Sequence, residues 1–189
     1  GIQAASLYWH VKDKPDLMDL LAEALFADFD PAAWTDTPVP ADTDWREQLF
    51  RFASAFRRYL LSRRDAARIL TNKFVMGPSL LRHLDEQLGW IRVSGLDERA
   101  AAFAFYNTLV FVHGSVLWET SPMSAAVARG TEPRVYLDQM RAELADLDPA
   151  EFPHAHALAS ALTSPGMTER FEFGLTCMLD GLAQQIDQA

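Results

Sequence analysis

The sequence predicts an all-α protein, and two observations support this prediction. Apolar residues recur at helical spacing along most of the chain, and no segment alternates apolar and polar residues as a strand does. Of the 189 residues, 49% are hydrophobic and 11% are aromatic, which excludes an intrinsically disordered chain. A chain of this length buries roughly 70% of its unfolded surface, so it has room for a sizeable core.

The first well-marked helix is expected at residues 14–29. Asp13 is placed to be its N-cap, Pro15 lies in the first turn, and Asp16 completes an approximate capping box. A shorter helical candidate precedes it at residues 4–10. Further helices are expected at residues 45–62, 65–75, 79–92, 97–120, 134–147 and 167–188. Loops that contain prolines are expected at residues 30–44, 121–133 and 148–166.

Composition also narrows the class of protein. The single cysteine, Cys177, excludes a disulfide scaffold and fits a reducing cytoplasm. No apolar run approaches the ~20 residues that span a bilayer, and no signal-peptide pattern opens the chain. We therefore expect a soluble, intracellular globular protein. Because the chain begins with Gly1 instead of methionine, we also expect it to be a fragment at its N-terminus.

Charge is unevenly distributed along the chain, whose formal net charge is −9. Residues 16–50 hold nine acidic side chains against Arg46 alone, a net charge of −8. Residues 51–73 hold seven basic side chains against Asp65 alone, a net charge of +6. The overall charge by itself argues against a nucleic-acid binder. We interpret the basic segment as the solvated face of a helix.

The opening segment nevertheless has the residue types of a helix that reads DNA. Such a helix needs small side chains in its leading turn, so that its backbone comes close to the base edges. Gln3 can hydrogen-bond a base, Ala4 and Ala5 can contact thymine methyl groups, and Ser6 can bind a base or a phosphate. Donors for flanking phosphates follow at Tyr8, His10, Lys12 and Lys14. Composition alone also fits an ordinary amphipathic helix with exposed aromatic side chains.

The string from Ser6 to Lys14, SLYWHVKDK, and the leucine-bearing helix after it resemble the recognition helix and the following helix of the tetracycline-repressor (TetR) family. A weaker match beginning at Phe56, FRRYLL, resembles the tetracycline-repressor branch itself. The resemblance implies that residues 1–29 are the remainder of a helix-turn-helix DNA-binding domain with its connecting helix, whose first two helices are missing. Residues 30–189 are then the ligand-binding and dimerisation domain. By similarity, the phosphate-contacting positions are Ser6, Tyr8, His10 and Lys14.

The resemblance also indicates how the effector pocket departs from that of the tetracycline sensors. Phe52 stands where those proteins have an amide that binds the drug, and Leu70 stands where they have the histidine that ligates the drug's magnesium. Trp118 falls on the carboxylate that supports the metal, and Asp30 falls on another polar drug-binding position. Because Leu70 cannot ligate a metal, we expect no metal site and no magnesium–tetracycline effector.

The expected pocket is therefore apolar and aromatic. It comprises Phe52, Phe56, Leu70, Ala102, Phe105, Tyr106, Asn107 and Leu109, of which Tyr106 and Asn107 are the candidates for orienting hydrogen bonds. Such a lining suits a flat polyketide, an aromatic compound or a lipophilic compound. An ordinary packed core is the alternative for the same residues.

The remaining polar residues carry no enzymatic motif. His154 and His156 are expected in a solvent-exposed loop, because no further ligands accompany them at metal-binding spacing. His113 is expected to be a buried, hydrogen-bonded histidine or one near a subunit interface, and Cys177 is expected to be a small core residue. No phosphate-binding loop, dinucleotide motif or nucleophile elbow occurs, so we predict that the protein is not an enzyme and uses no cofactor.

The helices at 97–120 and 167–188 carry more apolar surface than a thin bundle buries. The resemblance implies that they pair with their symmetry mates in a homodimer, where Gly114 and Ser115 permit close approach. The function it implies is that of a cytoplasmic repressor, released from double-stranded operator DNA by a small molecule that shifts residues 65–75 against residues 14–29. The alternative is a helical small-molecule-binding or enzymatic domain without a DNA-binding role.

Overall fold

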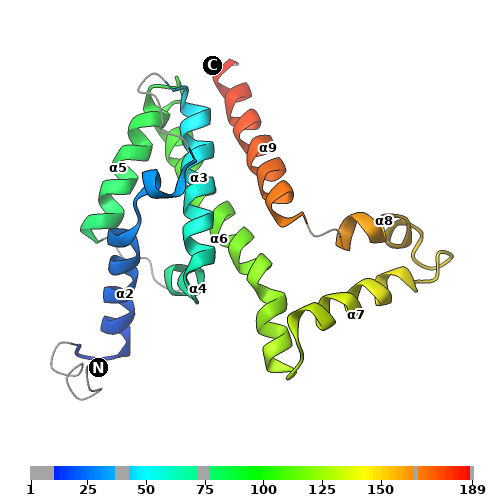
Figure 1. Ribbon diagram of the computed structural model, residues 1–189. Helices are drawn as coiled ribbons and strands as arrows, with labels where there is room; N and C mark the ends of the chain where they lie inside the picture. The colour runs from blue at the N-terminus through cyan, green and yellow to red at the C-terminus, as the bar shows by residue number, and fades with distance from the viewer. Residues whose placement is uncertain (1–10, 37–42, 72–76, 164–165, 188–189) are drawn as a thin grey trace. The chain divides into compact units, whose positions relative to one another are not determined.

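The computed structural model describes residues 11–36, 43–71, 77–163 and 166–187, and all regular structure in these ranges is helical (Figure 1). The all-α prediction is therefore confirmed, whereas the candidate helix at 4–10 lies outside the described residues. The elements are α2 (Lys14–Asp28), the short 3-10 helix η1 (Pro31–Trp34), α3 (Trp45–Ser62), α4 (Ala66–Thr71), α5 (Pro78–Arg92), α6 (Glu98–Ala128), α7 (Pro133–Ala145), α8 (Pro153–Thr163) and α9 (Met167–Asp187).

The chain divides into two compact units. The first unit is Gly1–Val116 together with Gly174–Ala189, and the second is Leu117–Phe173. In the first unit α3 packs against α4, α5 and η1, while α2 packs against α4 and α5. In the second unit α7 packs against α8, and the guanidinium of Arg141 donates to the carbonyl of Thr163 on α8 at 3.2 Å.

The beginning of α2 follows the predicted capping pattern. The Asp13 carboxylate accepts a hydrogen bond from the amide of Asp16 at 2.8 Å, which confirms Asp13 as the N-cap. The Asp16 carboxylate reaches back one residue further than in a standard capping box, because it accepts from the amide of Lys12 at 2.9 Å. Together the two carboxylates satisfy amides that the helix itself leaves unpaired.

Two of the predicted loops are wrong, and prolines account for both errors. Helix α6 continues through Pro122 to Ala128, and the alanines that follow the proline favour a helix. Helix α8 occupies most of the second expected loop and begins at Pro153, a position where proline is well tolerated. Both errors follow from the expectation that a proline ends a helix.

Helix α6 also corrects the expectation about apolar runs. Its stretch Glu98–Pro122 is long and apolar enough, by length and composition, to cross a membrane. The expectation concerns unbroken runs of apolar residues. The mean hydropathy of the helix can be high even though a few polar side chains interrupt the run. A core helix of a soluble protein meets the same criterion, and one side of α6 is indeed buried in the first unit, at Ala101, Ala104, Phe105, Thr108, Val112 and Val116.

The charges that are segregated along the sequence are paired in space. The guanidinium of Arg63 on α3 contacts the Asp28 carboxylate at the end of α2, and Arg58 contacts Asp36 at 3.4 Å. The interpretation of the basic segment as a solvated face is wrong for Arg57, which is buried, and correct for Arg64, which is exposed. Acidic and basic segments therefore join neighbouring elements of the first unit.

The burial of leucine side chains in the first unit predicts how much each contributes to the free energy of unfolding. Leu49 is 0% exposed, whereas Leu20 on α2 is 50% exposed. We expect Leu49→Ala to lower the free energy of unfolding by about 2–5 kcal/mol, since it removes buried hydrocarbon and leaves a cavity. Leu20→Ala is the matched control, with an expected change within about 0.5 kcal/mol. Urea denaturation measures both, and equal losses in the two variants would contradict this packing.

Candidate functional site

Six aromatic rings meet in the first unit, and we call them the aromatic cluster: Phe26, Phe29, Phe52, Phe56, Tyr59 and His83. Phe29 lies at its centre, with ring centroids 5.0 Å from Phe56 and 5.4 Å from His83. The rings come from α2, from the residue that follows α2, from α3 and from α5. The cluster therefore connects α2 to the core behind it.

His83 on α5 joins the cluster to the backbone of α2. Its Nε2 lies 3.1 Å from the carbonyl oxygen of Phe26, which can only accept, so Nε2 carries the proton. Nδ1 is then an acceptor, and it is buried without a hydrogen-bond partner among the described residues. One turn further along α5, the Gln87 amide nitrogen donates to the His83 carbonyl at 3.0 Å, and the buried Gln87 Oε1 likewise has no partner in the described part of the chain.

His113 on α6 borders the cluster from another side. Its ring packs edge-on against Phe56, at a centroid distance of 5.5 Å and an angle of 73°. Nδ1 lies 2.7 Å from the Leu109 carbonyl, as the prediction of a hydrogen-bonded histidine requires, and the buried Nε2 has no partner in the described ranges. Burial lowers the pKa of His113, and the hydrogen bond to Leu109 opposes this effect only in part. The imidazole is therefore neutral at physiological pH.

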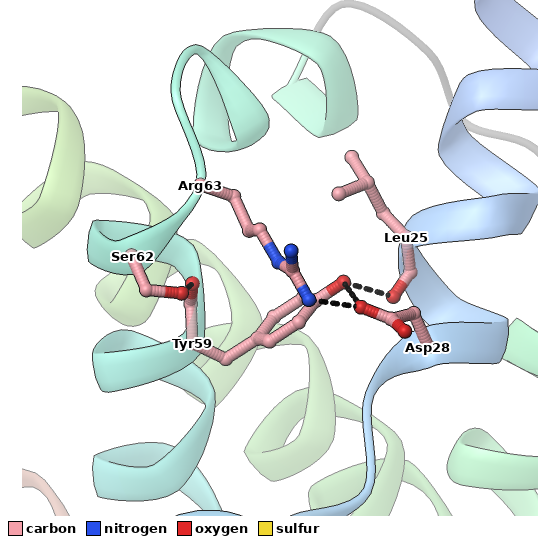
Figure 2. A network of polar contacts seen from close by, with 5 residues as sticks. All are labelled: Leu25, Asp28, Tyr59, Ser62 and Arg63. Carbon is pink, nitrogen blue, oxygen red and sulfur yellow. Dashed lines mark hydrogen bonds and ion pairs between the residues drawn. The ribbon is translucent and has the colours of Figure 1, made fainter.

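A polar network holds the end of α2 against α3 (Figure 2). The Tyr59 hydroxyl donates to the carbonyl of Leu25 at 2.8 Å and lies 3.4 Å from the Asp28 carboxylate, which also pairs with Arg63. Burial, followed by the nearby Asp28 charge, raises the pKa of Tyr59, so the hydroxyl keeps its proton and remains a donor. Two carbonyls in the last turn of α2, those of Leu25 and Phe26, thus bind side chains of the aromatic cluster.

A further contact joins α2 to the beginning of α5. The Glu23 carboxylate accepts a hydrogen bond from the amide of Ser79 at 3.0 Å. Gly77 is the N-cap of α5 and has no side chain to cap it, so Glu23 supplies the missing acceptor. A Cβ atom at Gly77 would collide with this carboxylate. Helix α5 therefore contacts α2 through Glu23 at its first turn and through His83 one turn later.

The structure brings together only part of the predicted pocket. Phe52 and Phe56 lie side by side in the cluster, 6.0 Å apart. Leu70 on α4 and Phe105 on α6 are buried in the same unit, and Leu109 is half-buried. Three residues lie instead on the exposed face of α6, so a single chain does not bring them into the cluster: Ala102, Tyr106 and Asn107.

The described residues include only the end of the predicted DNA-reading segment. Lys12 and Lys14 are exposed at the beginning of α2. Lys14 is the first residue of the helix, where the helix dipole disfavours a positive charge. The other predicted DNA contacts lie outside the described residues: Gln3, Ala4, Ala5, Ser6, Tyr8 and His10.

Several minor predictions are settled by burial. Cys177 is exposed on α9, so its assignment to the core is wrong; that helix turns this residue outward. His154 and His156 are exposed as predicted, but they lie in the first turn of α8 and not in a loop.

Trp118 is exposed, and the Asp30 carboxylate caps η1 by accepting a hydrogen bond from the amide of Ala32 at 3.0 Å. Among the described residues, no three His, Cys, Asp or Glu side chains are grouped to hold a metal.

His83 and Gln87 are the site residues that the sequence prediction missed. Both are buried, and they follow Leu80 and precede Ile91 on one face of α5. The sequence does hold a clue to them. His83 and Gln87 are four residues apart, and both fall on the apolar face of an amphipathic helix, where a polar side chain needs a buried partner.

Known proteins provide an independent comparison. The family model of the tetracyclin repressor-like, C-terminal domain matches residues 37–186. The chain is 34% identical to the tetracycline repressor protein class A from transposon 1721 of Escherichia coli, over 98% of this chain and 77% of that protein.

Two solved structures are similar over nearly the whole chain. The first is ActR of Streptomyces coelicolor in complex with actinorhodin, at 29% identity and a TM-score of 0.79, covering 97% of this chain and 82% of that one. The second is a TetR variant from Acinetobacter baumannii in complex with minocycline, at 25% identity and a TM-score of 0.64, covering 98% of this chain and 80% of that one.

The lowered pKa of His113 predicts a pH effect on stability. The unfolded chain binds a proton at this residue near the ordinary imidazole value of about 6.5, and the folded chain does so at lower pH. Between the two values the unfolded state binds more protons, so the stability that this residue contributes is lost as the pH falls. The loss is at most about 1.4 kcal/mol per pH unit.

Urea unfolding at about pH 7.5 and about pH 5.5 measures this effect. We expect the wild-type protein to lose more stability between the two conditions than His113→Gln. The exposed His154→Gln is the control and is expected to follow the wild-type protein. An identical loss in wild-type protein and His113→Gln would contradict the assignment.

Proposed function

Because the chain belongs to the TetR family of ligand-responsive transcriptional regulators, we propose that it is a repressor released from its operator by a small aromatic or lipophilic molecule. Residues 1–29 belong to the DNA-reading domain in this proposal, and residues 30–189 form the sensor and dimerisation domain. The supporting observation is that His83 contacts both the other rings of the aromatic cluster and the backbone of α2.

The chemistry of the cluster supports an aromatic effector. Phe52 and Phe56 offer flat apolar surfaces. The ring of Trp90 adds a third, with its centroid 6.0 Å from that of Phe52. By the sequence resemblance, Leu70 stands where the tetracycline sensors have a magnesium ligand. Its side chain is buried hydrocarbon, which cannot ligate a metal. ActR, which binds actinorhodin, is a structural relative with a higher TM-score than the minocycline complex. Magnesium–tetracycline is therefore not the effector in this proposal.

The contacts of α2 support a mechanism of release. An effector that packs against Phe52 and Phe56 displaces rings that also contact Phe29 and His83. His83 and Tyr59 hold the last turn of α2, and α4 packs against the same helix. A shift of α2 is carried to the reading segment that precedes it, where Lys12 and Lys14 and the residues before them contact DNA. A change from 1:99 to 99:1 between the two states requires about 5.5 kcal/mol of differential binding.

Dimerisation completes the proposal, because two reading heads must lie about 34–36 Å apart to bind successive major grooves. An exposed apolar stripe on α6 supports a homodimer, and Tyr106 in it is 60% exposed. No atom lies within 4 Å of a Cβ built on Gly114, so a second helix can approach there. The stripe, which we call the α6 stripe, consists of Ala102, Phe103, Tyr106, Asn107, Val110 and Gly114. Helix α9 joins α6 in the proposed interface, and the dimer acts in the cytoplasm.

Effector titration tests the proposed mechanism. Aromatic compounds are identified as ligands when they quench the tryptophan fluorescence of the protein. These compounds are expected to release the protein from an operator that is selected from a pool of random DNA sequences. Phe52→Ala is expected to weaken binding of such a compound about 10-fold or more, because it removes apolar contact area. Val93→Ala, which alters a side chain that is 83% exposed, is the control.

A gel-shift assay measures the release and fluorescence measures the binding. Operator affinity that stays unchanged with every compound bound at the cluster would contradict the mechanism. Release by magnesium–tetracycline, but not by aromatic compounds, would contradict the effector class.

Light scattering tests the dimer. We expect a dimeric mass at micromolar concentration for the wild-type chain and a monomeric mass for Tyr106→Glu, because a buried unpaired carboxylate in the α6 stripe is costly. Val93→Glu is the matched control, since Val93 is an exposed apolar residue outside that stripe. A monomeric wild-type chain, or a dimer that tolerates Tyr106→Glu as well as Val93→Glu, would overturn the proposed interface.

A further inference from the structure

We propose that the effector carries hydroxyl groups, and that the unpaired imidazole nitrogens of His83 and His113 accept hydrogen bonds from them. This inference rests on the proposed function, because it specifies the chemical class of the effector bound at the aromatic cluster. The ligand is a flat ring system with phenolic or enolic hydroxyls at its edge.

His83 is the first of the two acceptors. Its side chain is buried, with 9% of the residue exposed. A neutral imidazole has one N–H group, and at His83 this group is committed to the Phe26 carbonyl. Nδ1 therefore presents a lone pair that water does not reach and that no described residue satisfies. Buried polar atoms are almost always hydrogen-bonded, so an unsatisfied one beside a proposed binding site indicates a contact that the ligand supplies.

His113 repeats this arrangement on α6. Its N–H group is committed to the Leu109 carbonyl, and its Nε2 is buried without a partner among the described residues. Burial lowers the pKa of this histidine, which keeps Nε2 unprotonated and able to accept. The two imidazoles, although they lie on different helices, share one arrangement: one ring nitrogen donates to a backbone carbonyl and the other is a buried acceptor without a partner among the described residues.

Both imidazoles border the same pair of phenylalanines. His83 lies 6.3 Å from Phe52, His113 lies 5.5 Å from Phe56, and the two phenylalanine rings are 6.0 Å apart. Gln87 Oε1, one turn after His83, adds a third acceptor without a partner in the described ranges. The unsatisfied atoms of His83, Gln87 and His113 thus all accept. A ligand whose edge carries only carbonyl or ether oxygens would place lone pairs against lone pairs.

Three compounds of one shape test this selectivity: 2,6-dihydroxyanthraquinone, 2,6-dimethoxyanthraquinone and unsubstituted anthraquinone. The dimethyl ether keeps the ring area and the oxygens but removes both donors. We expect the wild-type protein to bind the dihydroxy compound about 10-fold more tightly than the dimethoxy compound, measured by tryptophan quenching.

Substitutions assign this preference to the two imidazoles. His83→Phe and His113→Phe keep an aromatic ring and remove the acceptor, so each is expected to reduce the preference severalfold. His83→Gln is expected to restore much of it, because the amide nitrogen can donate to Phe26 while the amide oxygen accepts. His154→Phe alters an exposed histidine on α8 and is expected to keep the wild-type preference.

A measurement on the wild-type protein makes the test independent of how the variants fold. Long-range proton–nitrogen NMR correlations report each imidazole nitrogen separately. Binding of the dihydroxy compound is expected to shift the signals of His83 Nδ1 and His113 Nε2, and binding of the dimethoxy compound is expected to leave them unchanged.

The outcomes separate this inference from the function on which it rests. Equal affinity for the dihydroxy and dimethoxy compounds, or unshifted imidazole nitrogens in the dihydroxy complex, overturns the donor requirement and leaves an aromatic effector in place. Failure of all three compounds to bind the folded protein overturns the inference together with the aromatic effector.

Discussion

The last turn of α2 has backbone carbonyls without hydrogen-bond donors inside the helix. The packing of the first unit depends on the side chains that donate to them. Tyr59 donates to the carbonyl of Leu25, and His83 donates to that of Phe26. Both side chains belong to the aromatic cluster, so a displacement of the cluster changes the hydrogen bonding of α2. A buried carbonyl that loses its donor costs about 1–3 kcal/mol, which makes α2 move with the cluster and not independently of it.

The charges strengthen the same coupling. Arg63 pairs with Asp28 beside the Tyr59 hydroxyl, and Glu23 caps the first turn of α5. The exposed Arg63–Asp28 pair contributes little to stability by itself, but it lies beside the Tyr59 hydrogen bond and adds a second contact between α3 and the end of α2. The acidic and basic segments that are separate in the sequence thus act as complementary surfaces between neighbouring helices.

Local chemistry explains which features could be predicted from the sequence. The helices with strong periodicity and the N-cap at Asp13 were predictable because they depend on neighbouring residues. The extension of α6 beyond residue 120 was not, because a single proline conflicts with a helix that other residues favour. Phe52 and Phe56 were assigned to one site and do meet, whereas His83 and Gln87 were missed because their partners are backbone carbonyls. Tyr106 is expected in the site only from the family resemblance, and it lies on the exposed face of α6. Because α6 is apolar nearly all round, periodicity alone could not identify its buried face.

Lys14 places a positive charge where α2 already presents the positive end of its dipole, and this local repulsion has a thermodynamic consequence. The carboxylates of Asp13 and Asp16 lie at the same turn and offset this repulsion. The beginning of α2 therefore carries its own countercharges, and salt screens their attraction and the Lys14 repulsion together.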